Sequence, residues 1–214
     1  RAYPMKIATW NVNGIRARAA QLCEWVAQEK PDVLCLQELK AEPAQIPEEC
    51  KLADYHVFWH GLRAYSGVSL HVHRNLASEV SFAHPDFDME SRIVAAQLGN
   101  VVFASLYVPN GGKDYTAKLK FVEALIAWAQ RMHGEGRELV LCGDINIAHR
   151  DIDVHPKERK AGVIGQRPEE RALFEKMLAV QLVDVCRVAN PENAEVFSWW
   201  PPWRNMRQRN IGWR

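Results

Sequence analysis

Two residues that could handle a water molecule follow the clearest apolar run of the chain. Residues 139–143 read Leu-Val-Leu-Cys-Gly, and Asp144 and Asn146 come directly after this run. In an extended chain, residues two apart point to the same side. A carboxylate beside a neutral amide suits the holding and deprotonation of a water. A strand that ends in an Asx turn explains this short motif equally well, so its meaning depends on the rest of the chain.

Polar side chains also follow three other predicted strands. The full set is Asn11, Asn13, Glu38, Tyr107, Asn110, Asp144 and Asn146. If these strand ends converge, two carboxylates, several amides and a phenol meet in one cleft. Carboxylate and amide oxygens are the ligands that Mg²⁺ prefers, and such an ion can neutralise a phosphate and assist attack by water. For Glu38 by itself, a solvated acid at a strand end is the simpler interpretation.

Three weaker features have structural as well as functional interpretations. Residues 110–113 (Asn-Gly-Gly-Lys) could bind a phosphate through backbone amides, but they lack the Walker spacing and are typical of a turn. His71 and His73 would share one face of a strand, and a partly buried pair is a simpler interpretation than a metal site. Among the acids that follow the Asp144 motif, we favour Asp153 as a second acid of the same cleft.

The stretch from Ser198 to Arg214 combines tryptophan with arginine and contains no acid. Its members are Trp199, Trp200, Trp203, Arg204, Arg207, Arg209, Trp213 and Arg214. Arginines can grip phosphates while aromatic rings offer stacking or an apolar pocket, which favours a nucleic-acid contact that includes Arg204 and Arg207. The alternative is a surface loop anchored by its tryptophans, with a solvated basic face.

Apolar periodicity predicts the elements that carry these residues. Strands are expected at residues 5–12, 33–37, 55–60, 66–73, 77–82, 92–98, 101–108 and from 139 onward. Helical spacing predicts helices at 16–30 and 115–132 and a third that begins at Pro168. Many strands, few helices and no regular βαβ alternation predict an α+β fold with two packed sheets flanked by helices. No repeat or linker is visible, so one domain over residues 1–214 is expected.

Composition is that of an ordinary globular protein. Of the 214 residues, 48% are hydrophobic and 25% charged, and the net charge is +1, so any basic surface must be local. Five cysteines without CxxC spacing predict reduced thiols in a cytosolic protein. No apolar stretch approaches the roughly 20 residues of a membrane span, and no signal peptide is visible. We therefore expect a cytoplasmic protein, associated with the nucleoid if the source is bacterial.

Six motifs together resemble a known family. They are Thr9-Trp10-Asn11-Val12-Asn13-Gly14, Leu36-Gln37-Glu38, Ser66-Gly67-Val68, Tyr107-Val108-Pro109-Asn110, Gly143-Asp144-Ile145-Asn146 and Gly212-Trp213-Arg214. In this order they resemble the exonuclease III type of abasic-site (AP) endonuclease, within the endonuclease/exonuclease/phosphatase superfamily, over essentially the whole chain. The resemblance implies a four-layer α/β sandwich and a monomer that hydrolyses, with Mg²⁺ or Mn²⁺, the phosphodiester 5′ to an abasic site in duplex DNA. It also implies 3′–5′ exonuclease and 3′-phosphatase activity on damaged 3′ ends.

The resemblance assigns catalytic roles position by position. Glu38 matches the metal-binding glutamate, and Asp144 matches the aspartate that activates or orients the attacking water near the metal. Asn146 matches the asparagine that holds this water with the phosphate, and Tyr107 the tyrosine that contacts the scissile phosphate. Asn11 matches an active-site asparagine at the metal.

Other positions match an acid and the DNA-contacting residues of the family. Asp153 matches an acid proposed to assist the leaving group. Asn110 and Lys113 fall at DNA-contacting positions, and Asn13 stands where some members have an aspartate. Trp199 and Trp213 resemble the walls of the pocket that takes the flipped abasic sugar. Extruding a nucleotide without a base forfeits little pairing energy, which is a physical source of selectivity.

The sequence departs from the family pattern after Arg214. Family members continue from Gly-Trp-Arg to an aspartate and later to a Ser-Asp-His motif, whose acids and histidine complete the site. We therefore expect this chain to be truncated at its C-terminus relative to the family.

Two other functions stay open at this point. The superfamily chemistry could act on another phosphate ester, such as a phospholipid, an inositol phosphate or RNA, although the Trp/Arg stretch argues against a small substrate. The chain could also be a catalytically incomplete module that only binds DNA, with an affinity that falls as salt rises.

Overall fold

The computed structural model describes residues 4–62, 64–160 and 162–214. By its internal contacts the chain divides into two compact units. Unit 1 comprises residues 1–109 and 132–145, and unit 2 comprises residues 110–131 and 146–214. The expectation of a single domain over the whole chain stays a prediction.

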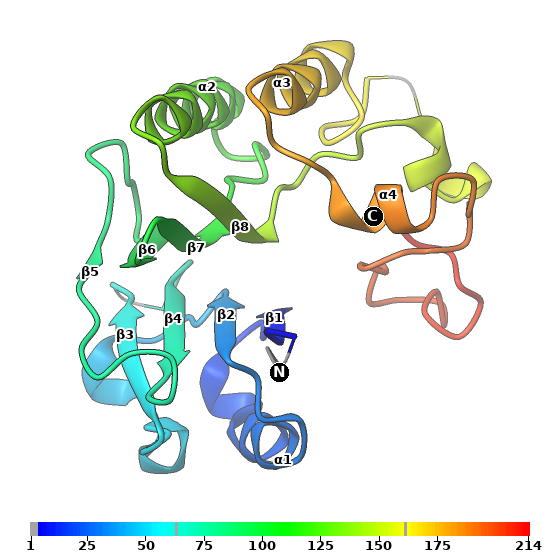
Figure 1. The fold of residues 1–214 in the computed structure, drawn as a ribbon. Coiled ribbons are helices and arrows are strands. Elements are labelled where there is room, and N and C mark those ends of the chain that lie inside the picture. The colour runs from blue at the N-terminus through cyan, green and yellow to red at the C-terminus, as the bar shows by residue number, and fades with distance from the viewer. Residues whose placement is uncertain (1–3, 63, 161) are drawn as a thin grey trace. The chain divides into compact units, whose positions relative to one another are not determined.

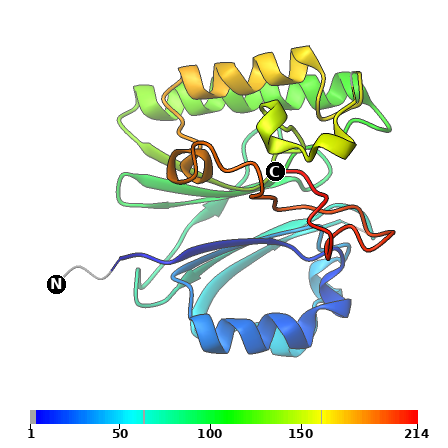
Figure 2. The same cartoon turned by 90° about the vertical axis from the view of Figure 1, so that its right-hand side faces the viewer.

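In its described residues, unit 1 holds two four-stranded mixed sheets that stack face to face (Figures 1 and 2). The first has the order β1-β2-β4-β3, with β1 at Ile7–Asn11, β2 at Val33–Gln37, β3 at Tyr55–His60 and β4 at Val68–His73. The second has the order β5-β6-β7-β8, with β5 at Phe82–Ala83, β6 at Ile93–Leu98, β7 at Val101–Tyr107 and β8 at Glu138–Asp144. The β1–β2 and β7–β8 pairs are parallel and the others antiparallel. The prediction of two packed mixed sheets is confirmed.

The inner faces of the two sheets form one apolar core. Alternate residues of β2 and β4 face alternate residues of β6 and β7, as the period-2 pattern of strands requires. The fully buried members are Val33, Cys35, Val68, Leu70, Val72, Val94, Ala96 and Phe103. The strand expected at residues 77–82 is wrong in position and length. Only Phe82 and Ala83 pair with β6, whereas Val80 packs on this core outside the strand.

A polar bridge crosses this core. The side-chain nitrogen of Gln37, 1% exposed, donates to the Ser105 hydroxyl at 3.1 Å, and that hydroxyl donates to the Leu36 carbonyl at 3.1 Å. On the other side, the Thr9 hydroxyl donates to the Gln37 side-chain oxygen at 3.1 Å. Buried polar groups of this kind are costly unless every partner is in place. The bridge therefore fixes how β2 of the first sheet lies against β7 of the second.

The outer face of the first sheet packs against α1 (Ala19–Glu29), which Figure 2 shows beneath the blue strands. Leu22 and Val26 of this helix lie against Leu34 and Leu36 of β2. The helix ends where Lys30 takes a left-handed conformation (φ 46°) ahead of Pro31, which cannot continue a helix. The helix predicted at residues 16–30 is thus confirmed in its main part, after a short 3₁₀ turn at Ile15–Ala17.

Unit 2 consists mainly of helices and long loops. It contains α2 (Tyr115–Gly134) as far as Arg131, α3 (Pro168–Ala179) and the short α4 (Val185–Ala189), which the apolar periodicity did not predict. Helices α2 and α3 lie side by side in both views, and the Tyr115 hydroxyl donates to Glu169 at 2.8 Å. Measured by length and apolarity, none of the described helices could cross a membrane. All five cysteines are free thiols, as predicted.

We expect His71 to make the protein less stable in mild acid. This residue of β4 is fully buried, and burial lowers its pKa to about 3. The unfolded chain takes up a proton below about pH 6.5, whereas folded His71 does not, so the free energy of unfolding falls by about 1.4 kcal/mol per pH unit. Urea denaturation between about pH 6.5 and 5, above the range in which acids titrate, measures this slope.

The His71→Gln variant should lose this part of the slope, and His73→Gln on the same strand should keep it. Equal slopes in the wild type and His71→Gln would show that His71 is protonated in the folded state.

Candidate active site: a carboxylate cluster at the strand ends

A carboxylate cluster forms in unit 1 where strands of both sheets end. Asn11 is the last residue of β1 and pairs with Gln37, so Glu38 follows beside it. Asp144 is the last residue of β8. The Asn11 side-chain nitrogen donates to Glu38 Oε1 at 2.7 Å and to Asp144 Oδ2 at 3.1 Å. One amide nitrogen therefore joins two carboxylates that are 106 positions apart in the sequence.

The orientation of the Asn11 amide follows from its three neighbours. Its nitrogen faces two carboxylate oxygens, and its oxygen accepts the backbone N–H of Asn13 at 3.1 Å. A flipped amide would place oxygen against oxygen and nitrogen against a donor. The amide oxygen is thus turned away from the carboxylates, so these contacts favour Asn11 as hydrogen-bond support rather than as a metal ligand.

Glu38 is held in an unusual conformation as an anion. Its backbone is left-handed (φ 54°), which costs a non-glycine residue of the order of 1 kcal/mol and is found most often at functional sites. Burial would raise the pKa of its carboxyl group, but hydrogen bonds from Asn11, Lys40 and Tyr107, together with the Lys40 charge, lower it overall. The ammonium of Lys40 lies 2.9 Å from Glu38 Oε2.

Tyr107 contacts the carboxylate cluster through Glu38, and Arg92 lies over the Tyr107 ring. Burial, followed by the negative charges of Glu38 and Asp144, raises the pKa of Tyr107, so its phenol stays protonated and can donate. The Arg92 guanidinium lies 4.8 Å from the Tyr107 ring centre and 5.5 Å from that of Tyr65. Arg92 is only 2% exposed and was missed from the sequence; the signal was a charged residue at the start of a predicted buried strand.

β8 approaches β7 closely at the residue before Asp144. A Cβ atom on Gly143 would lie 1.9 Å from the Leu106 carbonyl oxygen, and the residue has φ 145°. Only glycine fits there. Asn146 has φ 55°, so the chain leaves the extended conformation after the strand, and the side-chain alternation expected from Asp144 to Asn146 does not apply.

The donor set of the cluster fits a hard divalent cation. The carboxylates of Glu38 and Asp144 both accept from the Asn11 side-chain nitrogen, so they lie close together. A cationic group, the Lys40 ammonium, already contacts Glu38. Oxygen ligands of this kind match Mg²⁺ or Mn²⁺. Glu38 and Asp144 are therefore the residues that would hold the ion.

In unit 2, a buried lysine holds the backbone around two predicted site residues. Lys118 is fully buried on α2 and donates to the carbonyl of Asn146 at 2.6 Å and to that of Asn110 at 3.3 Å. Its ammonium also pairs with the fully buried Glu170 of α3. Lys118 was not predicted, although its position falls in phase with Val122 and Leu125 on the apolar stripe of the helix, which is an unusual place for a lysine.

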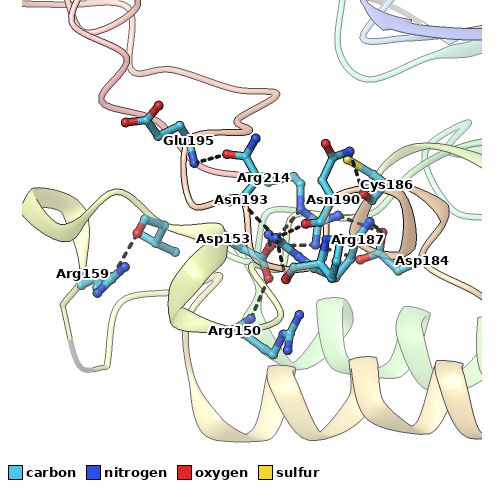
Figure 3. Close-up of polar contacts among 12 residues, drawn as sticks. Arg150, Asp153, Arg159, Asp184, Cys186, Arg187, Asn190, Asn193, Glu195 and Arg214 are labelled. Carbon is cyan, nitrogen blue, oxygen red and sulfur yellow. Dashed lines mark hydrogen bonds and ion pairs between the residues drawn. The ribbon is translucent and has the colours of Figure 1, made fainter.

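Asp153 lies in a closed ion-pair network of unit 2 (Figure 3). The carboxylate is fully buried, and its Oδ1 accepts from Arg187 and from Arg214 while its Oδ2 accepts the Arg150 backbone N–H. Burial would raise its pKa, but these donors lower it. A buried carboxylate so strongly held as an anion is a poor proton donor. Its contacts thus fit a structural anchor rather than the predicted help to a leaving group, and Arg214 continues the network to Asp184 at 2.9 and 2.8 Å.

The two tryptophans predicted as pocket walls contact each other. The rings of Trp199 and Trp213 meet edge to face with centres 5.9 Å apart, and their backbones form a bridge. Trp199 is 47% exposed. Between them, residues 200–212 form a loop in which the Arg207 guanidinium lies 5.4 Å from the Trp200 ring centre and Arg204 is exposed.

The remaining predicted DNA contacts lie in turns. The Asn110 side chain accepts the Gly112 N–H at 2.9 Å, which makes residues 110–112 an Asx turn, and Lys113 is exposed after it. Asn13, in unit 1, has φ 46° and its side-chain oxygen accepts from Lys40. The roles of these residues in DNA binding stay predictions.

Comparison with known proteins identifies the family. The model of the Endonuclease/Exonuclease/phosphatase family matches residues 8–214. The chain belongs to this family. It is 34% identical over 229 residues to DNA repair nuclease APEX1 of Danio rerio. The aligned region covers 100% of this chain and 72% of that protein. The resemblance to the exonuclease III type of AP endonuclease is confirmed.

Two solved structures share the fold of this Endonuclease/Exonuclease/phosphatase family member. An AP endonuclease from Archaeoglobus fulgidus matches with a TM-score of 0.85 and 31% identity, over 99% of this chain and 84% of that one. A 3′ phosphatase from Neisseria, bound to a product DNA hairpin, matches with a TM-score of 0.86 and 31% identity over the same shares. The α/β sandwich with two mixed sheets is thus confirmed, and the family depends on divalent metals.

We expect the Lys118→Met variant to be strongly destabilised. Removing the ammonium leaves the Glu170 carboxylate buried without its cation, and breaking a buried ion pair in this way costs about 3–5 kcal/mol. Lys120→Met, an exposed position on the same helix, should change stability by less than about 0.5 kcal/mol. Chemical denaturation measures both. If Lys118→Met were as stable as Lys120→Met, the network would not hold unit 2 together.

Proposed function

We propose that this chain is a divalent-metal-dependent DNA repair nuclease that hydrolyses the phosphodiester 5′ to an abasic site in duplex DNA. The observation that carries the proposal is the meeting of Glu38 and Asp144 on the Asn11 amide, in a member of this family. Relatives described as a DNA repair nuclease and as an AP endonuclease support the substrate class. We further propose that the ion is Mg²⁺ or Mn²⁺, that the protein acts as a monomer and that it works in the cytoplasm.

The side chains of the carboxylate cluster would have separate roles in phosphodiester hydrolysis. A bound ion would neutralise phosphate charge and favour attack by water. Asp144 would orient the water or accept its proton. The protonated Tyr107 phenol, held beside Arg92, would donate to a phosphate oxygen. Asn11 would keep the two carboxylates in register.

A second candidate activity is removal of a 3′ phosphate from DNA. It is favoured by the similarity to the Neisseria 3′ phosphatase, whose structure contains a product DNA hairpin. The same water attack on a terminal phosphate would need no change in the carboxylate cluster. The two activities differ in their products: the 3′ phosphatase activity releases inorganic phosphate, and the endonuclease activity leaves a nicked strand.

We expect a labelled duplex with one abasic analogue to be nicked 5′ to the lesion with Mg²⁺ and not with EDTA. Asp144→Asn and Glu38→Gln should each lower the single-turnover rate by at least about 100-fold, because each removes charge at the reacting centre. Denaturing gels give the rates, and a duplex with a 3′ phosphate tests the second activity in parallel.

Glu24→Gln, an exposed acid of α1, is the matched control and should keep the full rate. Near-normal nicking by Asp144→Asn would refute the site. Binding of the duplex that falls with salt, without any cleavage, would instead support a module that only binds DNA.

A further inference from the structure

A second group of side chains that could hold a metal ion lies away from the carboxylate cluster in unit 1. His60 ends β3, His84 directly follows β5, and Asp88 lies in the loop before β6. One ligand atom from each lies within 4.8 Å of the others. His60 Nε2 is 2.6 Å from Asp88 Oδ2, and the rings of His60 and His84 are 4.8 Å apart and nearly parallel, at 8°. Among the residues that the structure describes, it is the group of three or more His, Cys, Asp or Glu side chains whose ligand atoms lie close enough together to hold one ion.

We propose that His60, His84 and Asp88 bind a transition-metal ion of the Zn²⁺ class, which ties together the edge strands of the two sheets. Two imidazoles and one carboxylate are ligands for Zn²⁺, Co²⁺, Ni²⁺ or Cu²⁺ and not for Mg²⁺, which prefers oxygen. With three protein ligands, the fourth position is left for water.

This site differs from the carboxylate cluster in position as well as in chemistry. The sheet register runs from Asn11 through Gln37 and Val68 to His60 along one row. Three strand spacings separate the ends of that row by roughly 14 Å. The two groups therefore lie toward the same end of the first sheet, but they cannot share one ion.

The carboxylate of Asp88 is already oriented for this task. Its Oδ1 accepts the backbone N–H of Arg92 at 2.8 Å and that of Ile93 at 3.0 Å, which leaves Oδ2 directed toward His60. Outer contacts of this kind commonly fix the ligands of a metal site.

The position of the site suggests stabilisation rather than a second reaction. His60 ends the edge strand β3 and His84 directly follows the edge strand β5, which is only two residues long. Asp88 also holds the start of β6, where the Arg92 side chain lies beside Tyr107. An ion here would lock the short edge strand and the loop that carries Arg92.

The test uses the whole protein, stripped with a chelator and returned to buffer with excess Mg²⁺ to occupy oxygen sites. Titration of this sample with Zn²⁺ as the one added transition metal should show saturable binding of one Zn²⁺ ion per chain. At hundredfold excess over Kd, the Tm should rise by about 5 °C or more. Co²⁺ should give a visible absorption band from the same site. These readouts do not depend on nuclease activity, so the proposal can fail or hold independently of the proposed function.

Variants identify the ligands. His84→Ala, at an exposed position, should weaken Zn²⁺ binding at least tenfold and abolish both the Tm shift and the Co²⁺ band. Asp88→Asn should do the same while keeping an oxygen for the Arg92 and Ile93 N–H groups. His133→Ala, near the end of α2, is the control and should bind like the wild type. If His84→Ala and the wild type bind Zn²⁺ equally, the ion lies elsewhere, for example on thiols, and the proposal is wrong. Absence of saturable binding in the wild type would overturn it as well.

Discussion

The hydrogen bond from Gln37 to Ser105 sets the geometry on which the carboxylate cluster depends. It joins β2 of the first sheet to β7 of the second inside a core that consists mainly of apolar side chains. Apolar packing is not directional and tolerates sliding, whereas a buried amide and hydroxyl lose their partners if either sheet moves. Gln37 immediately precedes Glu38, and Ser105 lies two residues before Tyr107. Fixing this pair therefore fixes which ends of the two sheets come together.

The cluster itself is built from groups that oppose one another. Two anions are placed at one point, and Glu38 is held in a left-handed conformation that its side chain disfavours. A neutral amide, a lysine and a phenol offset this repulsion. Such an arrangement is poor as a stabilising element and suited to receiving a cation, which is why strained residues and concentrated charge so often mark functional sites.

Sequence patterns predicted the sheets well because alternation and short apolar runs report directly on buried strands. They also placed Asn11, Glu38, Tyr107 and Asp144 at strand ends, where the structure brings them together. The patterns failed where tertiary contacts decide. Arg92 and Lys118 are charged residues buried by partners distant in sequence, and Asp153 is committed to two arginines that no spacing reveals. The alternation assumed for Asn146 fails because its backbone turns left-handed just after β8.

The segment between Trp199 and Trp213 has a consequence for how the protein could diversify. Both of its ends are tied at one place by the bridge between these residues, and Met206 and Ile211 anchor it from within. Doubling the length of such a closed loop changes its closure entropy by only about 0.6 kcal/mol. The sequence and length of this loop can therefore change at little cost in stability. Its exposed tryptophan and arginines can be replaced by other residues while the rest of the fold stays the same.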